Sequence, residues 1–368
     1  MSHLFPRSSG AIALYPTTTT NPYVGMIRRG LEVRGVPVTD WSQWRLGNPT
    51  PRVLHLNWLE ILSHGRITRR SLLATHVTYL RLEAHMQRVR KAGGLTVWTA
   101  HNARPHEMGG DRRARLVQQW IDRIVGQVDA VISLSNAAIP IIREAHPTLV
   151  APITVIPHQS YRGEYPAGDR DGARVRLGIP ATARVCGMIG LMRPYKEIER
   201  GLDLFEDLEA PDTWLLILGD CFDPDLARRL AARAAGNPRV IFKVGHLDQQ
   251  AFADAYAACD AVLAMQRVML NSGSVMAALS LDRPVIAEPV GSLPELAETV
   301  GDDWLRLRKP LNAEALRHAL AMPLPAGSPD LAAFDINTIV EQHLKVYGFN
   351  AATQRNPSRE HANAAIED

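Results

Sequence analysis

Short apolar runs alternate with amphipathic helical patterns along the first half of the chain. The apolar runs predict strands at Ile12–Tyr15, Val53–Leu56, Leu95–Ala100, Ala130–Leu134 and Ile153–Ile156. Helical patterns separate them near 24–34, 67–91, 112–126 and 136–145. This rhythm is typical of a parallel sheet with a helix crossing between successive strands.

The same rhythm returns in the second half. Strands are predicted at Val185–Ile189, Trp214–Leu218, Val240–Val244, Ala261–Ala264 and Pro284–Ala287. Helices are predicted near 197–208, 223–235, 248–258, 274–281 and 293–299. The chain of 368 residues is long enough for two domains. The pattern therefore predicts an α/β fold of two Rossmann-like parallel-sheet domains.

Composition places the domain boundaries. Residues 1–165 form the first expected domain, and the polar, glycine-containing segment Tyr161–Gly178 lacks periodicity and is interpreted as a linker. Residues 179–335 form the second. An amphipathic helix within 336–349 is expected to return to the N-terminal domain, and the polar segment 350–368 is expected to be a disordered tail.

Charge is divided unevenly between the two halves. Residues 1–165 carry 20 Lys and Arg against 10 Asp and Glu, whereas residues 166–368 carry 21 against 28. The basic half is therefore the half expected to meet an anionic partner. There is no apolar run of 18 residues, and the N-terminal apolar stretch is too short for a signal peptide. We expect a cytoplasmic protein.

Several classes of site are disfavoured by missing motifs. Cys186, Cys221 and Cys259 form no C-x-x-C pair, so we expect buried thiols rather than disulfides or zinc ligands. Neither G-x-G-x-x-G after a strand nor a P-loop occurs, which disfavours dehydrogenases and P-loop nucleotidases. No D-x-D lies at a predicted strand end, and the one from Asp223 to Asp225 lies where a helix is expected to begin, so we expect no essential metal and no cofactor.

The predicted strands of the second half end in residues suited to an anion. Ligands of open α/β sheets bind outside the carboxyl ends of the strands. Arg193 and Lys196 follow the first of these strands, in GLMRPYKE, and could hold a diphosphate, although cations of an ordinary surface loop give the same pattern. Asn271, Ser272, Gly273 and Ser274 open a later helix, where free N–H groups favour phosphate, with simple helix capping as the alternative.

Glu288 ends another strand of this half. A carboxylate there could accept hydrogen bonds from a ribose or a sugar, or remain a solvated loop residue.

The ordered motifs from Val185 to Leu296 resemble the donor domain of GT-B glycosyltransferases. The resemblance rests on GLMRPYKEI, LILGD, VGHLD and the run ACDAVLAMQRVMLNSGSVMAALSLDRPVIAEPVGSLPEL. It implies that Arg193 and Lys196 hold the diphosphate of a nucleotide-sugar, which is a substrate rather than a cofactor. The SGS turn implies a further phosphate and sugar contact.

One departure from this resemblance bears on mechanism. The common retaining branch carries two glutamates eight positions apart, and Met269 and Ala277 stand in their places here. The SGS form is similar to bacterial exopolysaccharide transferases of the xanthan-type β-mannosyltransferase kind. The resemblance thus implies transfer of a hexose, with mannose from GDP-mannose as the expected donor and inversion as the expected stereochemistry.

The N-terminal half offers candidates for acid–base chemistry. His101, His106 and Glu107 follow the strand Leu95–Ala100, and an inverting transferase needs a base for the acceptor hydroxyl. We expect Glu107 to be the base, with either histidine as the alternative and helix capping as the structural role of Glu107. The resemblance implies that His101 lies near the donor sugar.

Two other strand ends of this half suit an acceptor sugar. Asn21 and Tyr23 follow the first strand, and Asn57 and Trp58 follow the second. Aromatic rings stack on sugars and amides hydrogen-bond to hydroxyls, although Trp58 is equally suited to a core.

The basic segment Arg66–Lys91 carries seven cations against Glu83, interleaved with apolar residues. It is expected to rest on an anionic membrane surface, at the inner face of the plasma membrane, or to be a solvated helix face. No nucleic-acid-binding module accompanies it. The resemblance implies a lipid-linked saccharide as the acceptor.

Two other functions fit the same scaffold. A nucleotide-sugar 2-epimerase would need no acceptor, so release of free nucleotide during turnover with acceptor separates it from a transferase. A non-catalytic partner subunit is compatible with the two missing glutamates, whereas the retained Arg193 and Lys196 argue against it.

Overall fold

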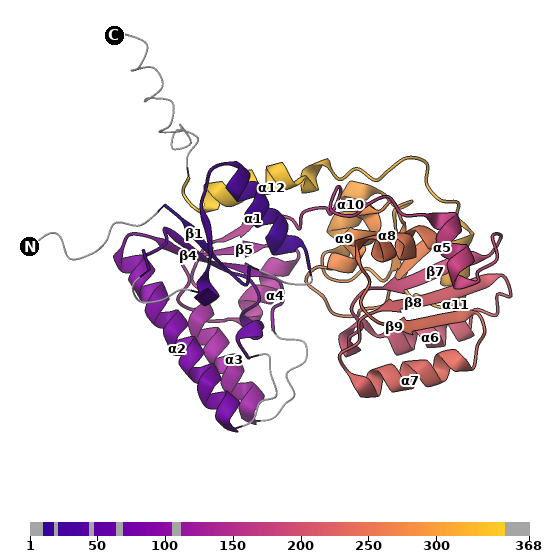
Figure 1. Ribbon diagram of the computed structural model, residues 1–368, viewed down its shortest axis with the longest axis horizontal. Helices are drawn as coiled ribbons and strands as arrows, with labels where there is room; N and C mark the ends of the chain where they lie inside the picture. The colour runs from indigo at the N-terminus through magenta and orange to yellow at the C-terminus, as the bar shows by residue number, and fades with distance from the viewer. Residues whose placement is uncertain (1–9, 18–20, 44–47, 64–68, 105–111, 350–368) are drawn as a thin grey trace, which may run out of the picture.

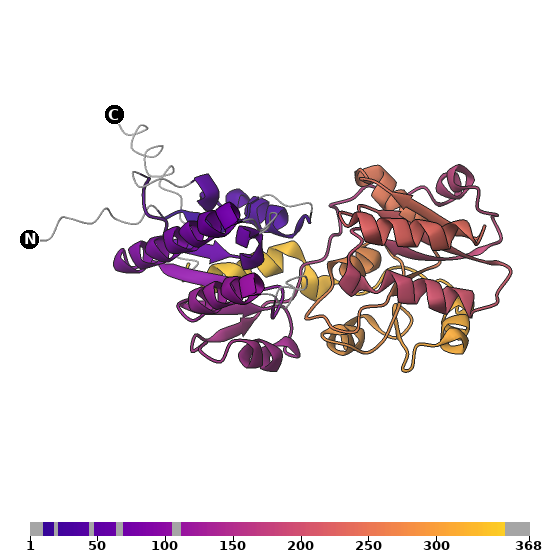
Figure 2. The same ribbon diagram turned by 90° about the horizontal axis from the view of Figure 1, so that it is seen from below.

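The computed structural model describes residues 10–17, 21–43, 48–63, 69–104 and 112–349. The described chain forms two α/β domains that lie side by side (Figures 1 and 2). The expected tail at 350–368 lies outside the described residues, and so do His106 and Glu107.

The N-terminal domain is built on a six-stranded parallel sheet with the order β2-β1-β3-β4-β5-β6. Its strands are β1 (Ile12–Tyr15), β2 (Val38–Asp40), β3 (Val53–Leu56), β4 (Leu95–Ala100), β5 (Ala130–Ser133) and β6 (Ile153–Val155). Its helices are α1 (Tyr23–Val33), α2 (Arg69–Lys91), α3 (Arg112–Val125) and α4 (Ala138–Ala145). Successive residues of the strands enter cores on opposite faces of the sheet: Leu54 packs with α2 and α3, and Val53 with α1.

The C-terminal domain repeats the plan, with the parallel strand order β12-β11-β10-β7-β8-β9. Its strands are β7 (Arg184–Ile189), β8 (Thr213–Gly219), β9 (Val240–Val244), β10 (Ala261–Ala264), β11 (Val285–Ala287) and β12 (Leu305–Leu307). Its helices are α5 (Arg170–Leu177), α6 (Ile198–Glu206), α7 (Pro224–Ala235), α8 (Gln249–Ala258), α9 (Gly273–Ser280), α10 (Leu293–Val300) and α11 (Ala313–Ala321). The two sheets agree with the predicted fold class.

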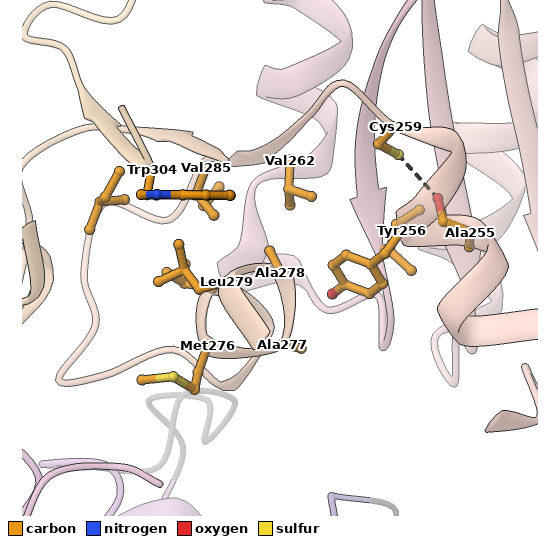
Figure 3. Close-up of a cluster of buried hydrophobic side chains, with 14 of the residues drawn as sticks. Ala255, Tyr256, Cys259, Val262, Met276, Ala277, Ala278, Leu279, Val285 and Trp304 are labelled. Carbon is orange, nitrogen blue, oxygen red and sulfur yellow. Dashed lines mark hydrogen bonds between the residues drawn. The ribbon is translucent and has the colours of Figure 1, made fainter. Parts of the chain in front are cut away.

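One face of this second sheet is packed by α8 and α9 (Figure 3). Val262 and Val285 point into this core, whereas their neighbours Leu263 and Ile286 enter the core on the opposite face. Cys259 is fully buried in the first core, and its Sγ would lie 2.4 Å from a Cβ added at Gly187. Cys186 is also buried and free, as predicted, whereas Cys221 is only half-buried.

The chain returns to the N-terminal domain at its end. Helix α12 (Ile336–Val346) packs along α1 in one core, although the two helices are about three hundred residues apart in the sequence (Figure 1). A Cβ added at Gly30 of α1 would lie 2.6 Å from Val340 of α12, so the two backbones approach closely. The Tyr347 hydroxyl lies 2.6 Å from Nδ1 of the buried His55.

The predicted linker contains a helix that the sequence analysis missed. Helix α5 occupies Arg170–Leu177, with Asp169 accepting the Gly172 N–H at one end and Gly178 at φ 70° at the other. The segment looks polar because one of its two buried residues is Arg174, whose guanidinium pairs with Asp260 at 2.9 Å. Strands β2 and β12 and helix α11 were also missed, and each strand is only three residues long.

Candidate functional site

A cleft of about 620 Å³ lies between the two domains. Residues that follow strands of both sheets line it, as expected for ligand sites of open α/β sheets. Eight predicted site residues lie among those lining it: Asn21, Trp58, His101, Lys196, Asn271, Ser272, Gly273 and Ser274. The cleft therefore brings together residues that are up to 253 positions apart in sequence.

The first turn of α9 forms part of the C-terminal wall. Ser272 caps the helix, its Oγ accepting the Val275 N–H at 3.4 Å and lying 3.2 Å from the Ser274 hydroxyl. Beyond this first turn the helix is buried, and only Ala277 of that part lines the cleft. The turn thus offers helix-start N–H groups and hydroxyls to an anion.

Lys196 lies beside this turn in the cleft wall. It ends a 3₁₀ turn at Pro194–Lys196, and Glu197 then takes the left-handed conformation at φ 50° before α6 begins. Burial, together with the neighbouring Arg193, lowers the pKa of the Lys196 ammonium to about 8. An anion bound here would restore the charged form.

Two glycines shape the floor next to Lys196. Gly190 follows β7 and Gly219 ends β8, with φ of 103° and 142°, and a Cβ on Gly219 would lie 2.2 Å from the Gly190 carbonyl oxygen. Both line the cleft. Only glycine allows the two strand ends to approach so closely.

Arg193 and Glu288 do not line the cleft. The Arg193 guanidinium lies 5.7 Å from the centre of the Phe222 ring, at the rim. The Glu288 carboxylate pairs with Arg200 at 2.5 Å. The carboxylate predicted to contact a sugar or ribose is thus held in an ion pair, because Arg200 of α6 reaches the same strand end.

His101 lies at the bottom of the cleft, on the side of the N-terminal domain. Its ring stacks on Trp58 with centroids 4.0 Å apart, and its Nε2 lies 3.1 Å from the Asn57 Oδ1. The side chain is 6% exposed, and burial lowers its pKa well below the ordinary value, with the nearby His158 acting in the same direction. His101 is thus a neutral imidazole that offers a polar edge to the cleft.

Tyr23 and Asn57 lie beneath the floor rather than in it. Tyr23 is fully buried and makes an edge contact with the His101 ring at 4.7 Å. Asn57 is 2% exposed, and its amide contacts the Tyr15 carbonyl and His101. Neither residue lines the cleft with the other predicted acceptor contacts, and their position one layer below the surface makes them supports for His101.

His158 and Tyr161 line the cleft although sequence reasoning did not select them. His158 lies three residues after the end of the last strand of the N-terminal sheet, so the strand-end rule applied to the other sites could have found it. Tyr161 was assigned to the linker, and its hydroxyl donates to the Asn21 Oδ1 at 2.9 Å.

The two domains are also joined by direct contacts beside the cleft. The Glu295 carboxylate of α10 accepts the N–H groups of Asn136 and Ala137 at the start of α4, at 2.9 and 3.2 Å. The Asn271 amide donates to the His101 carbonyl at 3.1 Å. These bonds hold the two walls in one relative position.

Among the described residues, no group of three or more His, Cys, Asp and Glu side chains is arranged to hold a metal ion. Asp223 instead caps α7 by accepting the N–H groups of Asp225 and Leu226. None of the described helices is both long and apolar enough to cross a bilayer.

The C-terminal domain matches a known family. Residues 183–323 match the model described as Glycosyl transferases group 1. Two proteins of Xanthomonas campestris pv. campestris, each named GDP-mannose:glycolipid 4-beta-D-mannosyltransferase, are 27% identical to the chain over 336 residues. The aligned region covers 90% of this chain and 89% of each relative.

Solved structures share the two-domain architecture. Anabaena Alr3699/HepE in complex with UDP and glucose is 17% identical, with a TM-score of 0.63 over 92% of this chain and 99% of that one. Sucrose-phosphate synthase from Thermosynechococcus elongatus is also 17% identical, with a TM-score of 0.59 over 97% and 96%. The two-domain fold, the group 1 match and the two relatives identify the chain as a glycosyltransferase of the GT-B fold.

Proposed function

We propose that the protein transfers mannose from GDP-mannose to a lipid-linked saccharide, with inversion, in exopolysaccharide synthesis. The observation that carries the proposal is the alignment with two GDP-mannose:glycolipid mannosyltransferases along nine-tenths of the chain. The interdomain cleft supports it, because residues suited to an anion line one wall and residues suited to sugars line the other.

The C-terminal wall would hold the donor diphosphate. As the sugar leaves, negative charge develops on the phosphate oxygen that was bonded to the anomeric carbon. Lys196 and the first turn of α9, from Ser272 to Ser274, lie together in this wall and would stabilise that charge. They would neutralise the charge of the leaving diphosphate, as a metal ion does in other transferases, so we expect transfer without an added metal.

The N-terminal wall would hold the sugars. Trp58 and Asn21 are the predicted acceptor contacts that line the cleft. His101 is neutral, so it can exchange hydrogen bonds with sugar hydroxyls without attracting the diphosphate. Glu107, or His106, remains our proposed base, which would take the acceptor proton as the acceptor oxygen attacks the anomeric carbon.

Helix α2 would rest on an anionic membrane. Leu73, Val77 and Leu80 are 67%, 46% and 46% exposed and lie at helical spacing on one face, next to the exposed Arg81. Arg90 is instead paired with Asp129 at 3.0 Å, so not every cation of the basic segment is available to bind anionic lipid. The proposed contact is therefore this mixed apolar and basic face.

The decisive experiment combines binding and product analysis. We expect GDP to raise the melting temperature more than UDP, ADP or dTDP, and we expect a lipid-linked saccharide to gain one hexose mass from GDP-mannose with release of GDP. Chelation of metals should leave the rate unchanged. If no nucleoside diphosphate changes the melting temperature, or if GDP-mannose is not consumed with any lipid-linked acceptor, the proposal is wrong.

Binding to vesicles tests the membrane contact separately. Wild-type protein should sediment with vesicles containing anionic lipid, and Leu73→Glu should not. Exposed Val33, on α1, supplies the matched control, because Val33→Glu adds the same charge to another surface. Equal sedimentation of all three proteins would contradict the contact.

A further inference from the structure

His158 lies where the chain crosses from the N-terminal domain towards the C-terminal one. It follows Ile156 and Pro157 after β6, and it lines the cleft with 7% of its side chain exposed. Its ring makes edge contacts with Tyr23 and Tyr161, with centroids 4.9 and 5.3 Å away. The imidazole is therefore held in a fixed orientation between the two domains.

Hydrogen bonds determine which nitrogen of His158 carries the proton. Nδ1 lies 2.8 Å from the Gln159 carbonyl oxygen, which can only accept, so Nδ1 carries the N–H. The neutral ring then has an unprotonated Nε2. Burial lowers the pKa of His158 to about 4, which keeps the ring neutral at physiological pH.

Within the described part of the chain, the one hydrogen-bonding group beside Nε2 is engaged elsewhere. The Tyr161 hydroxyl lies 3.3 Å from Nε2, but it has one proton and a shorter contact of 2.9 Å to the Asn21 Oδ1. That Oδ1 is fixed as an acceptor because it also receives the Tyr23 N–H at 2.9 Å. Nε2 is thus a buried acceptor that still lacks a good donor.

Nε2 points to the start of α9. A Cβ added at Gly273 would lie 3.9 Å from Nε2 and 3.3 Å from the Tyr161 hydroxyl oxygen. The donor-rich first turn of α9 and the acceptor Nε2 are therefore neighbours across the cleft floor. A phosphate would be repelled by the lone pair of Nε2, whereas a hydroxyl could donate to it.

We propose that His158 Nε2 accepts a hydrogen bond from a hydroxyl of the donor sugar and so contributes to selection of that sugar. This inference rests on the proposed function, because it takes the anion at α9 to be the diphosphate of a nucleotide-sugar. In this arrangement α9 and Lys196 hold the diphosphate, and His158 lies beside the hydroxyl groups of the attached sugar.

Binding of the donor without acceptor tests the inference. In His158→Leu, which removes the acceptor nitrogen, the Kd for GDP-mannose should rise about tenfold, and the Kd for GDP should stay within about twofold. His158→Gln, whose amide oxygen can occupy the place of Nε2, should recover part of the loss. His343→Leu is the matched control, because it removes another buried neutral histidine that does not line the cleft, and it should bind both ligands as wild type does.

Donor analogues that each lack one sugar hydroxyl identify the contact. The analogue that lacks the partner of His158 should bind wild type and His158→Leu equally, whereas the other analogues should keep the difference. Equal losses for GDP and GDP-mannose in His158→Leu, or no loss for either, would overturn the inference. If wild type binds neither ligand, the proposed function itself fails.

A measurement on the wild-type protein keeps the test independent of how the variants fold. In protein labelled with ¹⁵N-histidine, the Nε2 resonance of His158 should move on addition of GDP-mannose but not of GDP. The resonance is assigned by its loss in His158→Gln. A resonance that is unmoved by a saturating concentration of GDP-mannose would overturn the inference.

Discussion

Lys196→Met is the substitution with the most direct consequence for donor binding. Methionine keeps the unbranched apolar stem but removes the ammonium that lies in the cleft wall beside α9. Two unit charges 4 Å apart attract by about 4 kcal/mol at an effective dielectric of 20, before desolvation is subtracted. Hydrogen bonds to charged groups contribute about 1.5 to 3 kcal/mol in practice.

A loss of about 2 kcal/mol corresponds to a roughly 30-fold increase in the Kd for GDP. At a GDP concentration of 100 times the wild-type Kd, binding stabilises the wild-type protein by about 2.7 kcal/mol. The same concentration should stabilise Lys196→Met by only about 0.9 kcal/mol. Titration calorimetry gives the Kd, and thermal unfolding with and without GDP gives the stabilisation.

The pH dependence provides a second signature of the same ammonium. The pKa of Lys196 is lowered to about 8, so the ammonium is charged below that pH and progressively neutral above it. Because the diphosphate binds the charged form, wild-type affinity for GDP should fall between pH 7 and pH 9, by at most about tenfold per unit above the pKa. Lys196→Met should show no such fall.

Lys243→Met is the control, since Lys243 is an exposed lysine of the same domain that does not line the cleft. It should bind GDP as wild type does. If Lys196→Met bound GDP with the wild-type Kd at pH 7, or kept the wild-type pH dependence, the assignment of Lys196 to the diphosphate would be refuted.

Three further predictions concern stability. His158 and His343 are buried and neutral, with pKa values of about 4. Below pH 6.5 the unfolded chain therefore binds more protons than the folded chain, and each residue should lower the free energy of unfolding by about 1.4 kcal/mol at pH 5.5 relative to pH 7.5. Urea unfolding at the two pH values measures this change, and a flat profile would contradict it. Glu295→Ala should lower the free energy of unfolding by about 1 kcal/mol, because α4 loses its cap, whereas Glu298→Ala should not. Arg306→Met should cost about 3 kcal/mol, because the buried guanidinium donates to three carbonyl groups, and an unchanged melting temperature would exclude that role.

Much of the fold could be predicted from local patterns. Buried strands such as β3 and β10 are short apolar runs, and the helices between them have one apolar face, so the hydrophobic effect is visible in the sequence itself. The missed helix α5 shows where this fails. Its buried side combines Ala173 with Arg174, whose guanidinium is stabilised by Asp260 far along the chain.

The chemical character of the site was also visible from the sequence. Residues at strand ends must meet at one edge of a parallel sheet, so Lys196 and the turn at Ser272–Ser274 could be expected to lie together. The same rule placed His101 and Trp58 at the opposing edge. This reasoning needs only the direction of the strands and no knowledge of the side chains around them.

Only the tertiary structure decided which of these candidates face the cleft. Tyr23 and Asn57 follow strands as Trp58 does, but they lie one layer deeper and support His101. Glu288 is occupied by Arg200, and His158 acquires its position from the crossing between domains. Depth below a surface and the choice of ion-pair partner depend on contacts between distant segments, which spacing along the chain does not encode.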